Sequence, residues 1–241
     1  MWSPNHPPRA IAIDGPAASG KSSVGQRLAR HLGYLYFDTG VMYRAVAFLA
    51  HEQHIPPDDA ERLGALARTV RLDVLPAPEP PHYAVRADGR DITWALRLPE
   101  VEATVSAVSA HPSVRAALTE QQRRVGRQGR VVMVGRDIGT VVMPEAEFKV
   151  YLDASPEERA RRRYAELQAR GEPVSYEAVL AAVRERDHLD STRETAPLTR
   201  APDAIYVDTT HLSLDEVIAH LLNCIERGSP SPSSGKGGPP S

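Results

Sequence analysis

Cysteine, lysine and long apolar runs are scarce in this chain of 241 residues, whose length suits one domain with an insertion or two small domains. The single cysteine, Cys224, excludes an internal disulfide, and we expect a cytoplasmic protein. No apolar run approaches the about 20 residues of a membrane-spanning helix. Residues 1–8 (MWSPNHPP) lack the charged and apolar regions of a signal peptide. We therefore expect no membrane association.

A strong net charge is also absent. The chain has 29 lysine and arginine residues against 31 aspartate and glutamate residues, which gives a net charge of −2 and an isoelectric point near 6.5. Proteins that bind nucleic acid polymers usually carry a strongly basic surface, so the composition argues against that class of partner. Only three of the cationic residues are lysines. Arginine therefore carries most of the positive charge, and its planar fork can bind two phosphate oxygens at once.

The most specific motif lies near the N-terminus. Residues 11–33 read IAIDGPAASGKSSVGQRLARHLG and contain the pattern G-x-x-x-x-G-K-[ST], from Gly15 to Ser22. The glycines let the backbone curl so that successive N–H groups point at an anion. Lys21 adds a positive charge for the β- and γ-phosphates of a nucleotide, and the Ser22 hydroxyl can join the coordination shell of Mg²⁺. The motif predicts a phosphate-binding loop.

Five short apolar segments predict the strands of a parallel sheet. Their near-continuous apolar character is typical of strands covered by helices on both faces, and helical patterns lie between most of them. The segments are residues 9–14, 34–38, 131–135, 149–153 and 204–208. After the first, Val24, Leu28 and Leu32 recur on one face of a helix, which favours a phosphate loop over a turn used only for packing. Ligands are expected at the carboxyl ends of the strands.

One region breaks the α/β alternation. Three segments alternate between apolar and polar residues and are separated by turn signals, which predicts a small antiparallel β insertion over about residues 65–95. The segments are residues 71–76, 82–88 and 90–93. Two helices, around 99–110 and 113–126, are expected to follow, with a break at Pro112.

The predicted organisation is one domain between two disordered ends. Residues 228–241 are nearly all Gly, Ser and Pro and cannot bury enough surface to offset the entropy of ordering. We expect disorder there and in residues 1–8, with a single domain over residues 9–227. Residues 76–81 (PAPEPP) have no assigned purpose.

A basic helix follows the fourth predicted strand. Ser155 and Glu158 form a capping box at its start, and four arginines crowd its first turns. These are Arg159, Arg161, Arg162 and Arg163. Pairing of Glu157 with Arg161 and of Glu158 with Arg162 is one interpretation. The other is a lid over about residues 154–175, because two acids leave a surplus of positive charge that can close over a triphosphate.

Further arginines predict a second anion site. Arg186, Asp190 and Arg193 share one face of a helix expected from about Ser175 to Arg193, where they either pair with one another or bind a ligand. Arg44 and Arg136 lie just beyond the ends of two predicted strands. Several arginines at one rim of a sheet suggest an anion site opposite the phosphate loop. A kinase that acts on a phosphorylated acceptor needs two such sites.

These motifs together resemble the bacterial cytidylate kinases, a family of P-loop nucleoside monophosphate kinases. The matching segments are IDGPAASGKSSV, DTGVMYRAV, VSAVSAHPSVR, GRDIGTVV, KVYLDASPEERARRR and RERDHLDSTR, which lie in the family's order within about residues 10–222. The resemblance implies an α/β P-loop kinase fold: a five-stranded parallel sheet flanked by helices, an acceptor-binding antiparallel β insertion and a helical lid. It also implies a phosphotransferase that moves the γ-phosphoryl group of ATP, bound with Mg²⁺, to CMP or dCMP. We expect a monomer.

The resemblance further implies roles for individual residues. The donor ATP would be held by Gly15, Pro16, Ala17, Ala18, Ser19, Gly20, Lys21, Ser22, Ser23, Arg159, Arg162 and Arg163. The acceptor would be held by Thr39, Arg44, Ser106, Arg115, Arg136, Asp137, Arg186, Asp190 and Arg193. Lys21, Arg136 and Arg193 would act in the transfer itself, and Ser22 would contact the metal. The family often has serine in place of Thr39, an exchange that keeps the hydroxyl.

Two other functions remain open at this point. One is a P-loop kinase of another small metabolite, such as a sugar acid or shikimate, although the acceptor-side arginines favour a phosphorylated acceptor. The other is a nucleotide-driven switch or binding module. GTPase switches carry N-K-x-D and D-x-x-G motifs, and the sequence contains neither.

Overall fold

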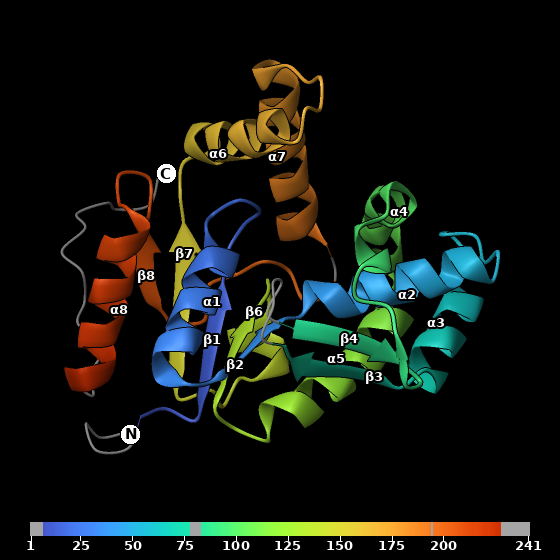
Figure 1. The fold of residues 1–241 in the computed structure, drawn as a ribbon, viewed down its shortest axis with the longest axis horizontal. Helices are drawn as coiled ribbons and strands as arrows, with labels where there is room; N and C mark the ends of the chain where they lie inside the picture. The colour runs from blue at the N-terminus through green and yellow to red at the C-terminus, as the bar shows by residue number, and fades with distance from the viewer. Residues whose placement is uncertain (1–6, 78–82, 194, 228–241) are drawn as a thin grey trace.

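The computed structural model describes residues 7–77, 83–193 and 195–227. Its main sheet has five parallel strands in the order β2-β6-β1-β7-β8 (Figure 1). The strands are β1 (Ala10–Asp14), β2 (Leu35–Asp38), β6 (Val131–Val134), β7 (Phe148–Asp153) and β8 (Ile205–Asp208). The five predicted strands and the parallel sheet are confirmed, and each strand agrees with its predicted segment to within one residue at either end.

The two faces of the sheet are covered by different helices. Along β1, Ile11 and Ile13 point into a core shared with α1 and α8, whereas Ala10 and Ala12 point into a core shared with α2, α3 and α5. The helices are α1 (Lys21–Leu32), α2 (Gly40–Glu52), α3 (Ala60–Thr69), α4 (Pro99–Ala110), α5 (Pro112–Gly126) and α8 (Leu214–Arg227). Because successive side chains of a strand point to opposite faces, two apolar layers form around one sheet. This arrangement leaves the carboxyl edge of the sheet open for ligands.

The predicted antiparallel insertion is also confirmed. The strands β3 (Leu72–Pro76), β4 (Tyr83–Ala87) and β5 (Arg90–Asp91) form a second, antiparallel sheet in the order β3-β4-β5. Asp88 and Gly89 have φ values of 48° and 85°, as the tight turn between β4 and β5 requires. A 3-10 turn, η1 (Ala95–Arg97), leads to α4, and Pro112 opens α5, where the sequence predicts a break. Residues 78–82 of this region lie outside the described residues.

Two helices stand above the carboxyl edge of the sheet (Figure 1). They are α6 (Pro156–Ala169) and α7 (Tyr176–Thr192), and Leu167, Val179 and Val183 belong to a small apolar core between them. Between β6 and β7, a single π-helical turn, η2 (Ile138–Val142), contacts β1 and α5. The helix predicted from about Ser175 to Arg193 is confirmed as α7.

The start of α6 differs from the prediction. The Ser155 hydroxyl accepts a hydrogen bond from Glu158 N at 3.2 Å, which is half of the predicted capping box. The other half is wrong, because the Glu158 carboxylate binds Arg161 and Arg162 instead of Ser155 N. Ser155 N donates to Thr210 Oγ1 at 2.9 Å. The loop after β8 therefore completes the cap.

The two ends of the chain lie largely outside the described residues. Residues 1–6 and 228–241, for which the sequence predicts disorder, are not described. Within the described part of the chain, no helix combines the length and apolar character that crossing a bilayer would require.

Candidate active site

The loop between β1 and α1 has the backbone that the phosphate-binding motif predicts. Gly15 has a φ of +148°, and a Cβ atom there would lie 1.9 Å from the carbonyl oxygen of Leu152. Gly20 has a φ of +91° and caps α1, while Ala18 also has a positive φ of 58°. The loop thus turns sharply against the end of β7 and presents the start of α1 to the open edge of the sheet. Free N–H groups and the positive end of the helix dipole favour an anion at that point.

Lys21 is folded back over this loop. Its Nζ donates to the carbonyl oxygen of Pro16 and lies 3.3 Å from Ser19 Oγ, and the side chain is buried. Burial holds the pKa of Lys21 well below its usual range, and the positive charge of Arg136 lowers the pKa further. Since Arg136 is one of the predicted acceptor-side residues, the two predicted cationic sites are electrostatic neighbours. A phosphate between them would add negative charge beside both cations.

Ser22 lies beside a carboxylate. Its Oγ is 3.4 Å from Asp38 Oδ2 at the end of β2, and Asp38 Oδ1 accepts from Gly40 N at 2.9 Å. Among the described residues, no group of three or more histidine, cysteine, aspartate or glutamate side chains could hold a metal ion. A hydroxyl and one carboxylate next to a phosphate loop fit Mg²⁺, which binds proteins through few oxygen ligands and shares the rest with phosphates and water.

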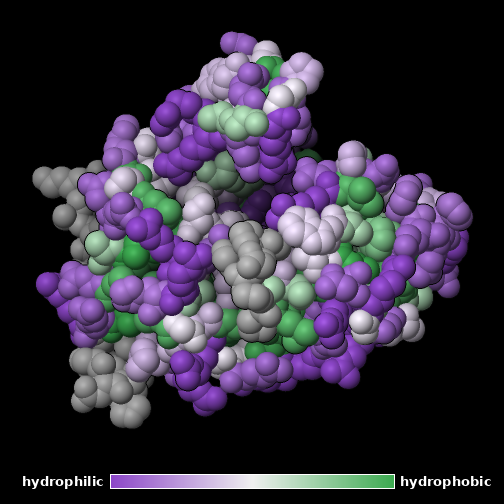
Figure 2. Space-filling model, in the orientation of Figure 1, coloured by the Kyte–Doolittle hydropathy of each residue, from purple (hydrophilic) through white to green (hydrophobic). Residues whose placement is uncertain are grey.

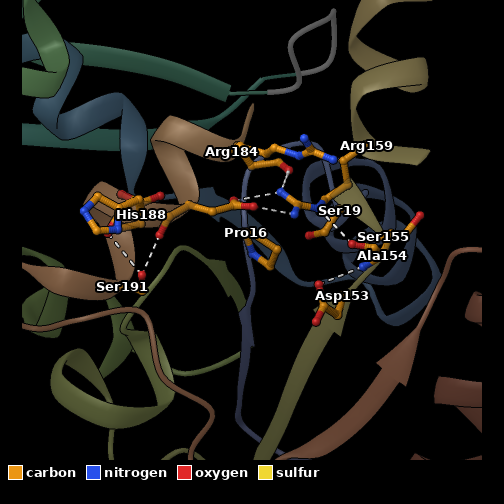
Figure 3. Close-up of polar contacts among 12 residues, drawn as sticks. Pro16, Ser19, Asp153, Ala154, Ser155, Arg159, Arg184, His188 and Ser191 are labelled. Carbon is orange, nitrogen blue, oxygen red and sulfur yellow. Dashed lines mark hydrogen bonds and ion pairs between the residues drawn. The ribbon is translucent and has the colours of Figure 1, made fainter. Parts of the chain in front are cut away.

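The arginines of α6 contact the phosphate loop. Figure 3 shows Arg159 reaching from α6 towards the loop that carries Pro16 and Ser19. Its Nη1 donates to the carbonyl oxygen of Ala17 at 3.3 Å, its Nε donates to that of Ala154 at 2.9 Å, and its guanidinium pairs with Asp187 of α7. The side chain is only 3% exposed. Arg159 therefore ties together the phosphate loop, the end of β7 and α7.

Arg162 and Arg163 are placed differently from Arg159. Arg162 donates to Thr209 O at 2.6 Å and to Thr209 Oγ1 at 3.1 Å, and a Cβ atom on Gly20 would lie 3.7 Å from its Nη1. Arg163 pairs with Glu166 at 2.8 Å and lies 3.9 Å from Glu102 of α4. Arg162 thus borders the phosphate loop, while Arg163 points towards α4.

Each of the four arginines near the start of α6 has an acidic partner. Glu158 pairs with both Arg161 and Arg162, and Arg159 finds its partner 28 residues further along the chain, in Asp187. The predicted pair of Glu157 with Arg161 is not among the contacts, because Glu157 pairs with Arg184 of α7 at 2.9 Å. Short-range spacing missed these partners because α7 packs against α6.

On the opposite side, three arginines converge on Asp190 near the end of α7. Asp190 Oδ2 accepts from Arg136 Nε at 2.8 Å, while Oδ1 lies 3.4 Å from Arg186 Nε. Arg193 Nη1 is 3.8 Å from Asp190 Oδ1. Burial alone would raise the pKa of Asp190, but the three guanidiniums hold it below its ordinary value. Arg193 Nη2 is buried and has no hydrogen-bond partner among the described residues, so this donor suits an anion.

A second buried ion pair lies next to this cluster. Arg115 Nη2 is 2.6 Å from Asp137 Oδ2, and both side chains are almost completely buried. Arg115 also donates to the carbonyl oxygen of Ser109 at 3.3 Å, and its guanidinium lies 5.3 Å from the ring centroid of Tyr43. Burial and the neighbouring charge of Arg115 lower the pKa of Arg193. The two clusters therefore form one cationic region with two fixed carboxylates.

The remaining predicted acceptor residues border this region. Ser106 Oγ of α4 accepts from Arg186 Nη1, which joins α4 to α7. Arg44 lies in the first turns of α2, where a Cβ atom on Gly40 would be 3.3 Å from its Nη1. Thr39 Oγ1 donates to the carbonyl oxygen of Val134 at 3.0 Å and is buried, so its hydroxyl hydrogen is already used.

The resemblance assigned no site role to four polar residues that the structure places at this edge. Asp14 accepts from the backbone of η2, Asp38 lies beside Ser22, Asp187 pairs with Arg159, and Thr209 accepts from Arg162. Asp14 and Asp38 close their apolar strands, which is a signal that sequence reasoning can use. The roles of Asp187 and Thr209 depend on partners that are distant in sequence.

A hollow separates α6 and α7 from the body of the molecule, and hydrophilic side chains line much of its edge (Figure 2). The phosphate loop and the arginine region are thus two cationic sites at the carboxyl edge of one parallel sheet. Together with the strand order, they define the class of P-loop kinases.

Comparison with known proteins gives the family. The cytidylate kinase family model matches residues 11–227. The chain is 50% identical over 217 residues to a cytidylate kinase of Carboxydothermus hydrogenoformans, covering 90% of this chain and 97% of that one. It is 50% identical over 220 residues to a cytidylate kinase of Herpetosiphon aurantiacus, covering 90% and 94%. The chain belongs to the cytidylate kinase family.

Proposed function

We propose that this protein transfers the γ-phosphoryl group of ATP to CMP, and also to dCMP, giving ADP and the nucleoside diphosphate. Membership of the cytidylate kinase family supports the reaction. The observation that carries it furthest is that the phosphate loop and the arginine cluster around Asp190 lie at the carboxyl edge of one parallel sheet. Two adjoining cationic sites suit a donor and an acceptor that both carry phosphate.

The donor side holds ATP through the backbone and a few cations. Residues 15–23 supply N–H groups to the phosphates, and Lys21 leaves its contacts with Pro16 O and Ser19 Oγ to bind them. Ser22 and Asp38 would hold Mg²⁺, which supplies neutralisation of the developing charge on the transferred group. Arg162 adds positive charge beside the loop, Arg163 would have to turn from α4 to reach ATP, and Arg159 acts mainly by fixing the loop and α7.

The acceptor side combines phosphate binding with selection of the base. Arg44, Arg136 and Arg193 bind the acceptor phosphate, and Arg193 Nη2, which has no hydrogen-bond partner in the described part of the chain, supports this role. Asp137 accepts from the cytosine amino group, while uracil would present an oxygen that the carboxylate repels. The base is also bound by Arg115 and Ser106, and Thr39 borders it. Arg186 and Asp190 bind the ribose hydroxyls of the acceptor.

The reaction needs no general base. The second pKa of the acceptor phosphate is about 6, so its attacking oxygen is already anionic at neutral pH. The barrier lies in bringing two anions into line, since unit charges 4 Å apart repel by about 4 kcal/mol at an effective dielectric constant of 20. Lys21, Arg136 and Arg193 oppose this repulsion, and closure of residues 154–175 excludes water that would otherwise hydrolyse ATP.

The setting of the reaction is part of the same proposal. We expect a monomeric enzyme that works in the cytoplasm, where ATP, Mg²⁺ and pyrimidine nucleotides meet. The single cysteine, Cys224, is a free thiol on the buried face of α8, as suits a reducing compartment. Sedimentation of the purified protein across a range of concentrations tests the expected monomer.

The direct test is a coupled assay of ADP release. The purified protein is supplied with ATP and Mg²⁺ and offered CMP, dCMP, UMP, AMP, GMP and shikimate in turn. We expect the highest kcat/KM with CMP or dCMP and a loss of turnover when the metal is chelated. Preference for shikimate, or tight ATP binding with no turnover on any acceptor, would contradict the proposal.

A further inference from the structure

Asp14 is a buried carboxylate at the active-site edge that the proposed reaction leaves without a role. It is the last residue of β1, directly before Gly15 of the phosphate loop, and it is 4% exposed. Its Oδ1 accepts a hydrogen bond from Ile138 N at 2.8 Å, and its Oδ2 accepts one from Gly139 N at 2.7 Å. A buried carboxylate that uses both oxygens on the backbone of one turn holds that turn in a single orientation.

The turn that Asp14 holds continues directly from the acceptor residues. Ile138 and Gly139 directly follow Arg136 and Asp137 in the chain. Holding the N–H groups of Ile138 and Gly139 in place therefore also holds the loop that carries Arg136 and Asp137. Asp14 precedes the donor loop by one residue. One carboxylate therefore links the donor loop to the acceptor loop through two hydrogen bonds.

The surroundings of this contact leave little freedom to move. A Cβ atom on Gly139 would lie 3.3 Å from Asp14 Oδ2 and 3.2 Å from Lys149 Cδ of β7. Burial raises the pKa of Asp14, while the hydrogen bonds from Gly139 N and Ile138 N lower it. The carboxylate is thus enclosed by the donor loop, the acceptor loop and β7.

We propose that Asp14 is a positioning residue that sets the acceptor loop at a fixed distance from the phosphate loop, so that the two phosphates meet in line. The proposal rests on the phosphoryl transfer proposed above and adds a residue that touches neither substrate. In-line transfer depends on sub-ångström placement, and a displacement of about 1 Å can reduce a rate about 100-fold. Each substrate keeps its own binding residues when the contact is lost, so the rate of transfer should fall without loss of binding.

The test begins with Asp14→Asn, which keeps the size of the side chain. The amide has only one acceptor oxygen, and its NH₂ group would face the N–H of Ile138 or Gly139. We expect kcat to fall by about 10- to 100-fold while the KM values for ATP and CMP stay within about threefold of the wild type. Amide hydrogen exchange at Ile138 and Gly139 should accelerate.

A second variant and a control keep the test decisive. Gly139→Ala crowds the same contact without removing the charge, and we expect a smaller fall in kcat, by about fivefold, again without a change in KM. If Asp14→Asn fails to fold, the kcat and KM of Gly139→Ala test the proposal instead. Asp203→Asn is the matched control, because it removes a carboxylate from Lys149, at 2.8 Å, outside the contact. It should leave kcat within about twofold.

The outcomes separate the two proposals. A wild type that turns over CMP, with Asp14→Asn and Gly139→Ala retaining its kcat, overturns the role of Asp14 alone. Variants whose KM values rise while kcat is kept also overturn it, because binding and not alignment has then been lost. A wild type that binds ATP but phosphorylates no nucleotide overturns the proposed function, even if the exchange at Ile138 and Gly139 responds as expected.

Discussion

The donor side and the acceptor side of the site hold their arginines in different ways. On the donor side, Arg159 and Arg162 donate to carbonyl oxygens of Ala17, Ala154 and Thr209, so the backbone fixes them. On the acceptor side, the arginines gather around two buried carboxylates, Asp137 and Asp190. The donor cations are thus part of the framework, whereas the acceptor cations are held by charges that a ligand can replace.

This difference follows from what each side has to recognise. Phosphates of a donor nucleotide can be bound by backbone N–H groups at a helix start, so the donor loop needs few side chains. The acceptor side also has to distinguish one nucleoside monophosphate from another by its base and sugar, and this requires carboxylates and guanidiniums in fixed positions. The following predictions test the comparison, from the largest expected effect to the smallest.

The largest effect is expected from Lys21→Ala on the donor side. The substitution removes the charge that faces the β- and γ-phosphates, and we expect kcat/KM to fall by about 1000-fold, or about 4 kcal/mol. CMP binding, measured by calorimetry without ATP, should be kept, because the acceptor residues are unchanged. A variant with kcat/KM within tenfold of the wild type would contradict the role of Lys21.

Asp137→Asn is expected to act on the acceptor side alone. The amide no longer repels the uracil oxygen and leaves Arg115 without its buried partner, so kcat/KM for CMP should fall by about 30-fold and the preference for CMP over UMP should shrink. The affinity for ATP, measured separately, should change by less than about threefold. An unchanged kcat/KM for CMP would show that Asp137 does not bind the base.

Arg159→Ala tests whether donor-side arginines act as framework. Its removal leaves Asp187 unpaired and two carbonyl oxygens without a donor, so the free energy of unfolding in urea should fall by about 2 kcal/mol. Arg161→Ala is the matched control, because Arg161 is exposed on the same helix and, within the described residues, pairs with Glu158 alone. It should cost less than about 0.5 kcal/mol.

The smallest effect is a pH dependence that comes from Asp14. Burial raises the pKa of Asp14 from its ordinary 3.8 to about 6, and Asp137 adds to the shift while Lys21 opposes it. The folded protein therefore holds this proton more tightly than the unfolded chain, and the resulting stability is lost as the pH rises through about 6. Between about pH 5 and about pH 7, wild-type stability should fall by about 1 kcal/mol relative to Asp14→Asn. Urea titrations of both proteins measure the difference, and parallel pH profiles would contradict it.

Much of the fold could be predicted because its signals are local. The five parallel strands are apolar runs, and the insertion is marked by alternation and by the Asp88–Gly89 turn. The contacts that fix the site depend instead on long-range packing. Arg159 pairs with Asp187, and Ser155 is capped by Thr210, 55 residues away. The position of Asp14 at a strand end is visible in the sequence, but its contacts are not, because its partners are backbone N–H groups more than 120 residues away.

The hydrogen bond between Ser106 and Arg186 joins α4 to α7 across the acceptor side. A nucleotide that uses both side chains has to part them on entry, and the diphosphate has to part them again when it leaves. Each catalytic cycle then includes two separations of α4 from α7, and a faster phosphoryl transfer would not shorten either of them. The frequency with which these helices separate sets a ceiling on the number of molecules processed per second.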